Sequence, residues 1–120
     1  MNIESLRLYC LSQKAATEDT PFGPDTLVFR VIGKIFALMG LDADECSINL
    51  KCNPDFAIEL REKHPDHIIP GYHMNKQHWN TIICDGSVSN KQIKEWIDYS
   101  YNLIVNSLTK KLKIELDCYK

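Results

Sequence analysis

The sequence has little excess charge of either sign. Its 120 residues carry a formal net charge of −2 at pH 7, which argues against strong, delocalised binding to nucleic acid or to an acidic membrane surface. It also lacks a long apolar run, so we predict no membrane-spanning segment. The N-terminus has no basic region followed by an apolar stretch, which predicts no signal peptide. A local basic surface remains compatible with this charge balance.

Cysteine is present but forms no recognisable pattern. The five cysteines are odd in number and include no CxxC pair, which argues against a secreted disulfide scaffold. We therefore expect the reducing environment of the cytoplasm. No cysteine has a neighbour in sequence that marks it as a nucleophile, so we expect these residues to act as small buried apolar side chains.

Catalytic motifs are also missing from the sequence. It contains no GxSxG, no glycine-rich phosphate loop and no motif of paired carboxylates, the patterns that commonly mark hydrolases and phosphate-binding enzymes. We therefore predict a protein that is not an enzyme and that uses no cofactor or bound metal. Its function is to be sought in a binding surface.

The signals that are present follow one another closely along residues 1–120. Their order is helix, three strands, helix, one or two strands, helix, and then a short last helix. We place these elements at about 2–14, 27–31, 34–39, 47–52, 53–64, 79–84, 89–108 and 110–116. This order predicts a single α+β domain of two layers, with helices packed on one face of an antiparallel sheet. Such a sheet can leave its other face to solvent or to a partner.

Turn and capping residues mark several of the expected boundaries. Asn2, Asn53 and Ser89 are each placed to cap the N-terminus of a helix. The pair Ile32-Gly33 is short enough to join two strands as a tight hairpin. In the third strand the apolar residues alternate with polar ones, which predicts one buried and one wet face.

All four histidines lie between positions 64 and 78. They are His64, His67, His73 and His78. Their spacing matches neither a zinc finger nor an HExxH helix. A catalytic or metal site that combined His73 or His78 with Cys84 would depend on contacts made by the fold.

The segment PGYHMNKQHWNTI, residues 70–82, is rich in hydrogen-bond donors and flat rings. Tyr72 and Trp79 supply the rings, and the donors are His73, Asn75, Lys76 and His78. This mixture suits phosphate oxygens together with stacking on bases or sugars. The alternative is structural, because such loops use His and Asn side chains to satisfy backbone groups, and a tryptophan commonly anchors a core. Both interpretations stay open for Lys76 and His73.

Several blocks of the chain resemble, in order, blocks of the MmcQ/YjbR family of small bacterial proteins. They are ATEDTPFGPDTLVFRV (16–31), GKIFALMGLD (33–42), INLKCNPDFAIELRE (48–62), IPGYHMNKQHWNTI (69–82) and DGSV (85–88). The string GYHMNKQHWNT is the most specific of them. The resemblance implies a CyaY-like (frataxin-like) or secretion-chaperone-like fold, in which helices pack on an antiparallel sheet. The first helix lacks the acidic ridge with which frataxins meet iron, so iron binding is not implied.

The resemblance also implies a function. The family is usually described as DNA-binding with a double wing motif, in which the wings would be β-hairpins. In this chain the wing would be the hairpin 27–39, and the segment around His73 would lie near the other end of the sheet. The residues expected to contact DNA, weakly and without sequence specificity, are His73, Asn75, Lys76, His78, Arg30, Lys34 and Lys51.

Two other hypotheses compete with DNA binding. One is a protein-interaction module, chaperone-like or regulatory, that uses the open face of the sheet. The other is a small-molecule or metal site lined by His73, His78 and Cys84. The positions of these side chains in the fold distinguish the three.

Overall fold

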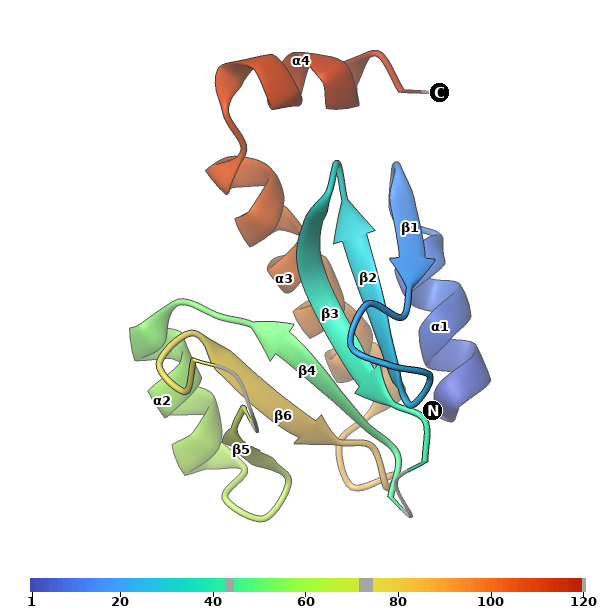
Figure 1. The fold of residues 1–120 in the computed structure, drawn as a ribbon. Coiled ribbons are helices and arrows are strands. Elements are labelled where there is room, and N and C mark those ends of the chain that lie inside the picture. Colours follow the sequence, from blue (N-terminus) through green and yellow to red (C-terminus); the bar gives the residue numbers. More distant parts are fainter. Residues whose placement is uncertain (43–44, 72–74, 120) are drawn as a thin grey trace.

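An antiparallel sheet forms the front layer of the fold (Figure 1). The computed structural model describes residues 1–42, 45–71 and 75–119. In this part of the chain the sheet has six strands in the order β1-β2-β3-β4-β6-β5. Their bounds are β1 Ala16–Asp19, β2 Thr26–Val31, β3 Lys34–Gly40, β4 Ser47–Lys51, β5 Ile68–Pro70 and β6 Trp79–Ile83.

Most of the helices form the second layer. The helices are α1 Ile3–Leu11, α2 Pro54–Lys63, α3 Asn90–Ser107 and α4 Lys110–Asp117. In Figure 1, α1, α2 and α3 lie behind the sheet, and α4 lies beyond the tip of the β2–β3 hairpin. The predicted α+β architecture is therefore confirmed. Within the described residues, none of the helices combines the length and apolarity needed to cross a bilayer.

The predicted helix starts are confirmed by the capping bonds. The side chain of Asn2 accepts a hydrogen bond from Ser5 N, that of Asn53 from Asp55 N, and that of Ser89 from Gln92 N. The end of the first helix was predicted wrongly, because α1 stops at Leu11 and not near residue 14. Ser12 is its C-cap, and Ala15 then takes a positive φ of 61° that turns the chain into β1.

The predicted hairpin between β2 and β3 is confirmed. Ile32 and Gly33 have φ values of 47° and 81°, and a two-residue hairpin turn of type I′ needs positive φ at both positions. Glycine takes this conformation freely, whereas a β-branched residue is strained there. The side chain of Ile32 is partly buried and packs against the main core, which compensates for the strain.

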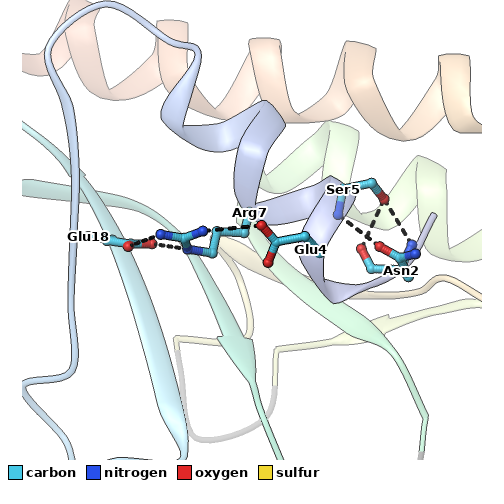
Figure 2. A network of polar contacts seen from close by, with 5 residues as sticks. All are labelled: Asn2, Glu4, Ser5, Arg7 and Glu18. Atoms are coloured by element: carbon cyan, nitrogen blue, oxygen red, sulfur yellow. Dashed lines mark hydrogen bonds and ion pairs between the residues drawn. The ribbon is translucent and has the colours of Figure 1, made fainter.

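The prediction missed the edge strand β1, and it allowed a second strand after α2 without placing it, which the structure shows to be β5. β1 has the sequence ATED, which contains no run of alternating apolar residues. All four of its residues pair with β2, and a charged pair also joins it to α1: Arg7 donates from Nε and Nη2 to the carboxylate of Glu18, at 2.8 and 2.6 Å (Figure 2). A two-pronged bond of this kind fixes geometry as well as distance, and it ties the edge strand to the helix layer.

The main core lies between the sheet and the helices. Phe36 is fully buried there, with its ring 5.4 Å from that of Tyr101 in an edge-on arrangement and 6.4 Å from that of Phe29. The register of β2 with β3 shifts between Phe29 and Arg30, so Arg30 is paired with Ile35. This bulge lets Phe36 and Ala37 both point into the core.

The join between β3 and β4 is short. Among the described residues, two register pairs connect the strands, Ala37 with Leu50 and Leu38 with Asn49. Next to them the hydroxyl of Ser100, in α3, replaces a direct strand contact. It donates to the carbonyl of Phe36 at 2.6 Å and accepts from the N–H of Lys51 at 2.9 Å. Helix α3 thereby completes the hydrogen bonding of the sheet.

Candidate nucleic-acid interface

The face of the sheet opposite the helices carries a second, smaller set of apolar residues. Val28, Leu38 and Trp79 are buried together, and Ile35 packs against them. Trp79 is therefore an anchor of a buried cluster, as the structural alternative predicted, but the cluster lies outside the main core. Cross-strand partners share a face of a sheet, so the pairs Arg30–Ile35 and Lys51–Trp79 place two basic residues beside this apolar patch.

Hydrogen bonds to Asn75 stabilise the turn before β6. Asn75 Oδ1 accepts from Gln77 N at 2.9 Å, and the Asn75 carbonyl accepts from the N–H groups of His78 and Trp79 at 3.1 and 3.0 Å. The carbonyl of His78 in turn accepts from Cys52 N at 2.7 Å. The structural role that the sequence suggested is thus present for Asn75. This turn leaves the side chain of Lys76 exposed beside the end of β4.

The predicted DNA-contacting residues do not all share one face. Arg30 is on the open face, where its guanidinium binds Asp19 Oδ1 and the Gly33 carbonyl, each at 3.1 Å. Lys34 pairs with Val31, whose side chain belongs to the helix-side core, so Lys34 lies toward the other face. His73 lies outside the described residues. The two-residue turn sets these faces, because it pairs Val31 with Lys34 and Arg30 with Ile35.

The turn at residues 75–78 lies at the same end of the sheet as the hairpin tip, not at the other end as predicted. Leu50 is paired with Ala37 and Lys51 with Trp79. The end of β4 is therefore level with the start of both β3 and β6. Two antiparallel pairings, β3 with β4 and β4 with β6, bring the starts of β3 and β6 to one end, and with them Lys34 and Lys76.

This arrangement separates charge along the strands. At the hairpin-tip end the strand termini and their flanks carry bases, namely Lys14, Lys34, Lys51 and Lys76. At the opposite end the flanks of β2, β3, β4 and β6 carry exposed acids, namely Asp25, Asp42, Glu45 and Asp85. Asp55, in the first turn of α2, follows β4 and is an acid of the basic end. The bases and acids that flank the strands can be read from the sequence, but only the strand register shows that they gather at opposite ends of the sheet.

The three histidines that the structure describes, His64, His67 and His78, make separate contacts. His64 packs its ring against Trp96, 5.6 Å between centroids, and His67 Nε2 lies 3.2 Å from Asp85 Oδ2. His78 precedes β6 and Cys84 follows it, so a strand length of roughly 20 Å separates them. That separation removes the support for a site shared by His78 and Cys84. In the described ranges, no three potential metal-ligating side chains come together.

The cavity between β4, α2 and α3 is too small for a substrate. Its volume is about 10 Å³, which is room for one water molecule. Asn80 lines it, and its side-chain nitrogen donates to the Ala57 carbonyl at 3.3 Å while its buried Oδ1 has no hydrogen-bond partner. Such a cavity fits packing around a single polar group better than ligand binding.

Comparison with known proteins decides the family. A family model described as YjbR matches residues 11–103. The chain belongs to the YjbR family. It is 32% identical to the YjbR protein of Escherichia coli strain K12, over 97% of this chain and all of that one. It is 38% identical to the E. coli O157:H7 protein YbdF, over 76% of this chain and 74% of that one. Both relatives are named as uncharacterized proteins.

Two solved structures share the fold. The crystal structure of the Deinococcus radiodurans protein DR2400, whose domain is described as DUF419, superposes with a TM-score of 0.91 at 36% identity, covering 97% of this chain and 88% of that one. A Pseudomonas syringae protein gives 0.74 at 32% identity, covering 86% and 98%. The resemblance of the sequence blocks to the MmcQ/YjbR family is thereby confirmed.

Proposed function

We propose that this YjbR-family protein is a cytoplasmic, non-enzymatic module that binds DNA weakly and without sequence specificity. The binding surface would be the end of the sheet that carries Lys34, Lys51 and Lys76, with His78, Asn75 and Arg30 beside them. The observation that supports it is the charge separation along the strands, which concentrates bases at one end of a chain of net charge −2. Phosphate contacts need such a local cationic region more than an overall basic protein.

The spacing of these bases suits a phosphate backbone. Lys34 begins β3, Lys51 ends β4, and Lys76 stands before β6, which are successive strands of the sheet. Neighbouring strands are about 4.8 Å apart, so the three side chains span roughly 10 Å across the sheet. Long flexible lysines over that distance can reach a few consecutive phosphates. Engaging about four phosphates would give a log–log salt slope of roughly −3 to −4.

The test is fluorescence anisotropy of a labelled DNA duplex at two salt concentrations. Lys51→Ala and Lys76→Ala are compared with wild type, and Lys91→Ala is the matched control. Lys91 is exposed in the first turn of α3, at the opposite end of the sheet. We expect each of the first two variants to weaken binding and to reduce the salt slope by about 1, while Lys91→Ala behaves as wild type.

Two results would contradict the proposal. One is the absence of binding at low salt. The other is an equal loss of binding for Lys91→Ala and Lys76→Ala, because that would mean that overall charge matters and the basic end does not.

A second candidate is protein binding on the open face. It is favoured by Ile69, an exposed apolar side chain on the face that also carries the buried cluster of Val28, Leu38 and Trp79. Ile69 is paired with Thr81 on this face and is 40% exposed. Ile69→Ser would then abolish recovery of a specific protein partner in nuclease-treated pull-downs, without changing anisotropy with DNA. Recovery that is unaffected by this change would argue against the open face as the contact.

A further inference from the structure

Two cysteines face each other just beyond the paired ends of β4 and β6. Ser47 is paired with Ile83 at the end of the ladder, and the next residues outward are Cys46 and Cys84. The N–H of Cys84 donates to the carbonyl of Cys46 at 2.8 Å. The antiparallel pairing therefore continues for one more residue and sets the two cysteines directly opposite one another.

This position fits the geometry of a disulfide. Directly opposed residues in a hydrogen-bonded antiparallel pair have Cα atoms about 5.5 Å apart, and disulfides join Cα atoms roughly 4.4–6.8 Å apart. Opposed side chains also share a face of the sheet. Here Cys84 is buried in the main core, and the partly buried Cys46 packs against the same core. Both thiols are free.

The two thiols also influence each other's ionisation. Burial raises the pKa of Cys46, and a hydrogen bond with Cys84 partly opposes this. Burial raises the pKa of Cys84 to about 12, and the Cys46 thiol adds to the shift. The thiolate is the attacking species in disulfide exchange, so burial of the two thiols favours exchange at alkaline over neutral pH.

The other three cysteines occupy separate elements. Cys10 lies in α1, Cys52 follows β4, and Cys118 is the exposed C-cap of α4. Cys52 stands at the far end of β4 from Cys46. Among the described residues, Cys46 and Cys84 are the pair that the strand register sets opposite one another.

We propose that Cys46 and Cys84 are a thiol–disulfide exchange site, which forms a reversible cross-strand disulfide with a small disulfide such as oxidised glutathione as the oxidant. The Cys46 thiolate, the more accessible of the two, attacks one sulfur of the oxidant and releases one molecule of reduced glutathione. The Cys84 thiolate then attacks the Cys46 sulfur of the mixed disulfide and releases the second. The protein gives up two protons and two electrons, and the oxidant is reduced to two thiols.

The experiment uses the intact wild-type chain with oxidised glutathione at about pH 8.5, where more thiolate is available. Remaining free thiols are alkylated at low pH before a non-reducing tryptic digest. Cleavage after lysine gives peptides 35–51 and 77–91, which contain Cys46 and Cys84 as their single cysteines. We expect these two peptides to be recovered as one linked species about 2 Da lighter than their sum, and to separate after addition of dithiothreitol.

Controls separate this link from general oxidation. Cys52→Ser should retain the linked peptides, whereas Cys84→Ser should lose them and leave Cys46 as a glutathione adduct. Exposed Cys118 reports that the oxidant has reacted. A glutathione adduct on Cys118 without any link between 35–51 and 77–91 would overturn the proposal. So would a link found only in covalent dimers on a non-reducing gel, because the bond would then join two chains.

Discussion

The two faces of the sheet are built for different purposes. The helix-covered face buries large residues from almost every element, including Phe29, Phe36 and Ile48. The open face buries, among the described residues, the cluster of Val28, Leu38 and Trp79. Since hydrophobic stabilisation grows with the apolar area removed from water, most of the folding free energy comes from the covered face. The open face is thereby free to carry charged and exposed side chains without loss of the fold.

The comparison predicts a large difference between two core truncations. Phe36→Ala should lower the free energy of unfolding by about 3–5 kcal/mol, because its ring is fully buried between Phe29 and Tyr101. Leu38→Ala, in the open-face cluster, should cost only about 2 kcal/mol. Urea unfolding followed by circular dichroism measures both. Equal losses would mean that the two faces contribute alike.

Gly71→Ala tests how closely Gly71 packs against Trp79, a member of the open-face cluster. A Cβ at this position would lie 2.8 Å from Trp79 Cβ and 3.0 Å from the Trp79 carbonyl oxygen, and the Gly71 N–H already donates to that oxygen at 2.8 Å. Backbone must therefore shift, and we expect a loss of about 1–3 kcal/mol. Urea unfolding followed by tryptophan fluorescence gives the value. A midpoint equal to that of wild type would show that this approach is not tight.

Ser100→Ala tests the contribution of the helix layer to the sheet itself. It removes the partner of both the Lys51 N–H and the Phe36 carbonyl, and leaving such groups unpaired should cost about 1–3 kcal/mol. Ser107→Ala in the same helix is the control, because that exposed hydroxyl bonds only to the carbonyl of Ile104 and should change stability by about 0.5 kcal/mol or less. Similar effects from the two variants would contradict the bridging role.

The smallest expected effect is at the acidic end of the sheet. The backbone N–H of Ser87, followed by His67, holds the pKa of Asp85 below its ordinary value. A carboxylate with a lowered folded-state pKa contributes stability above its unfolded pKa and loses it as the pH falls through the folded value. Asp85→Asn should therefore reduce the decline of the urea midpoint between about pH 6 and pH 3. An unchanged decline would show that the shift carries no stability.

The elements with strong local patterns could be predicted from the sequence. The capped helices, the hairpin at Ile32-Gly33 and the alternation of β4 all follow from local chemistry. β1 could not be predicted and β5 could not be placed, because ATED and IIP owe their strand structure to partners elsewhere in the chain. Cys118 is exposed although we expected buried cysteines, since it follows the last turn of a surface helix.

The candidate site was predictable in its composition but not in its arrangement. Lys76 and Lys51 are exposed or half-exposed at one sheet end, but their proximity rests on the pairing of Lys51 with Trp79. Arg30 and Lys34 lie toward opposite faces because the two-residue turn pairs Val31 with Lys34 and Arg30 with Ile35. The long-range register that pairs Lys51 with Trp79 leaves no trace in local periodicity.

The short join between β3 and β4 has a mechanical consequence. It divides the sheet into a half formed by β1, β2 and β3 and a half formed by β4, β6 and β5, with two register pairs between them in the part of the chain that the structure describes. Helix α3 packs across both halves, so it holds them together. Exchange of the amide protons at the β3–β4 join should be limited by local separation of α3 from the sheet. These protons should exchange faster than those at the centre of either half.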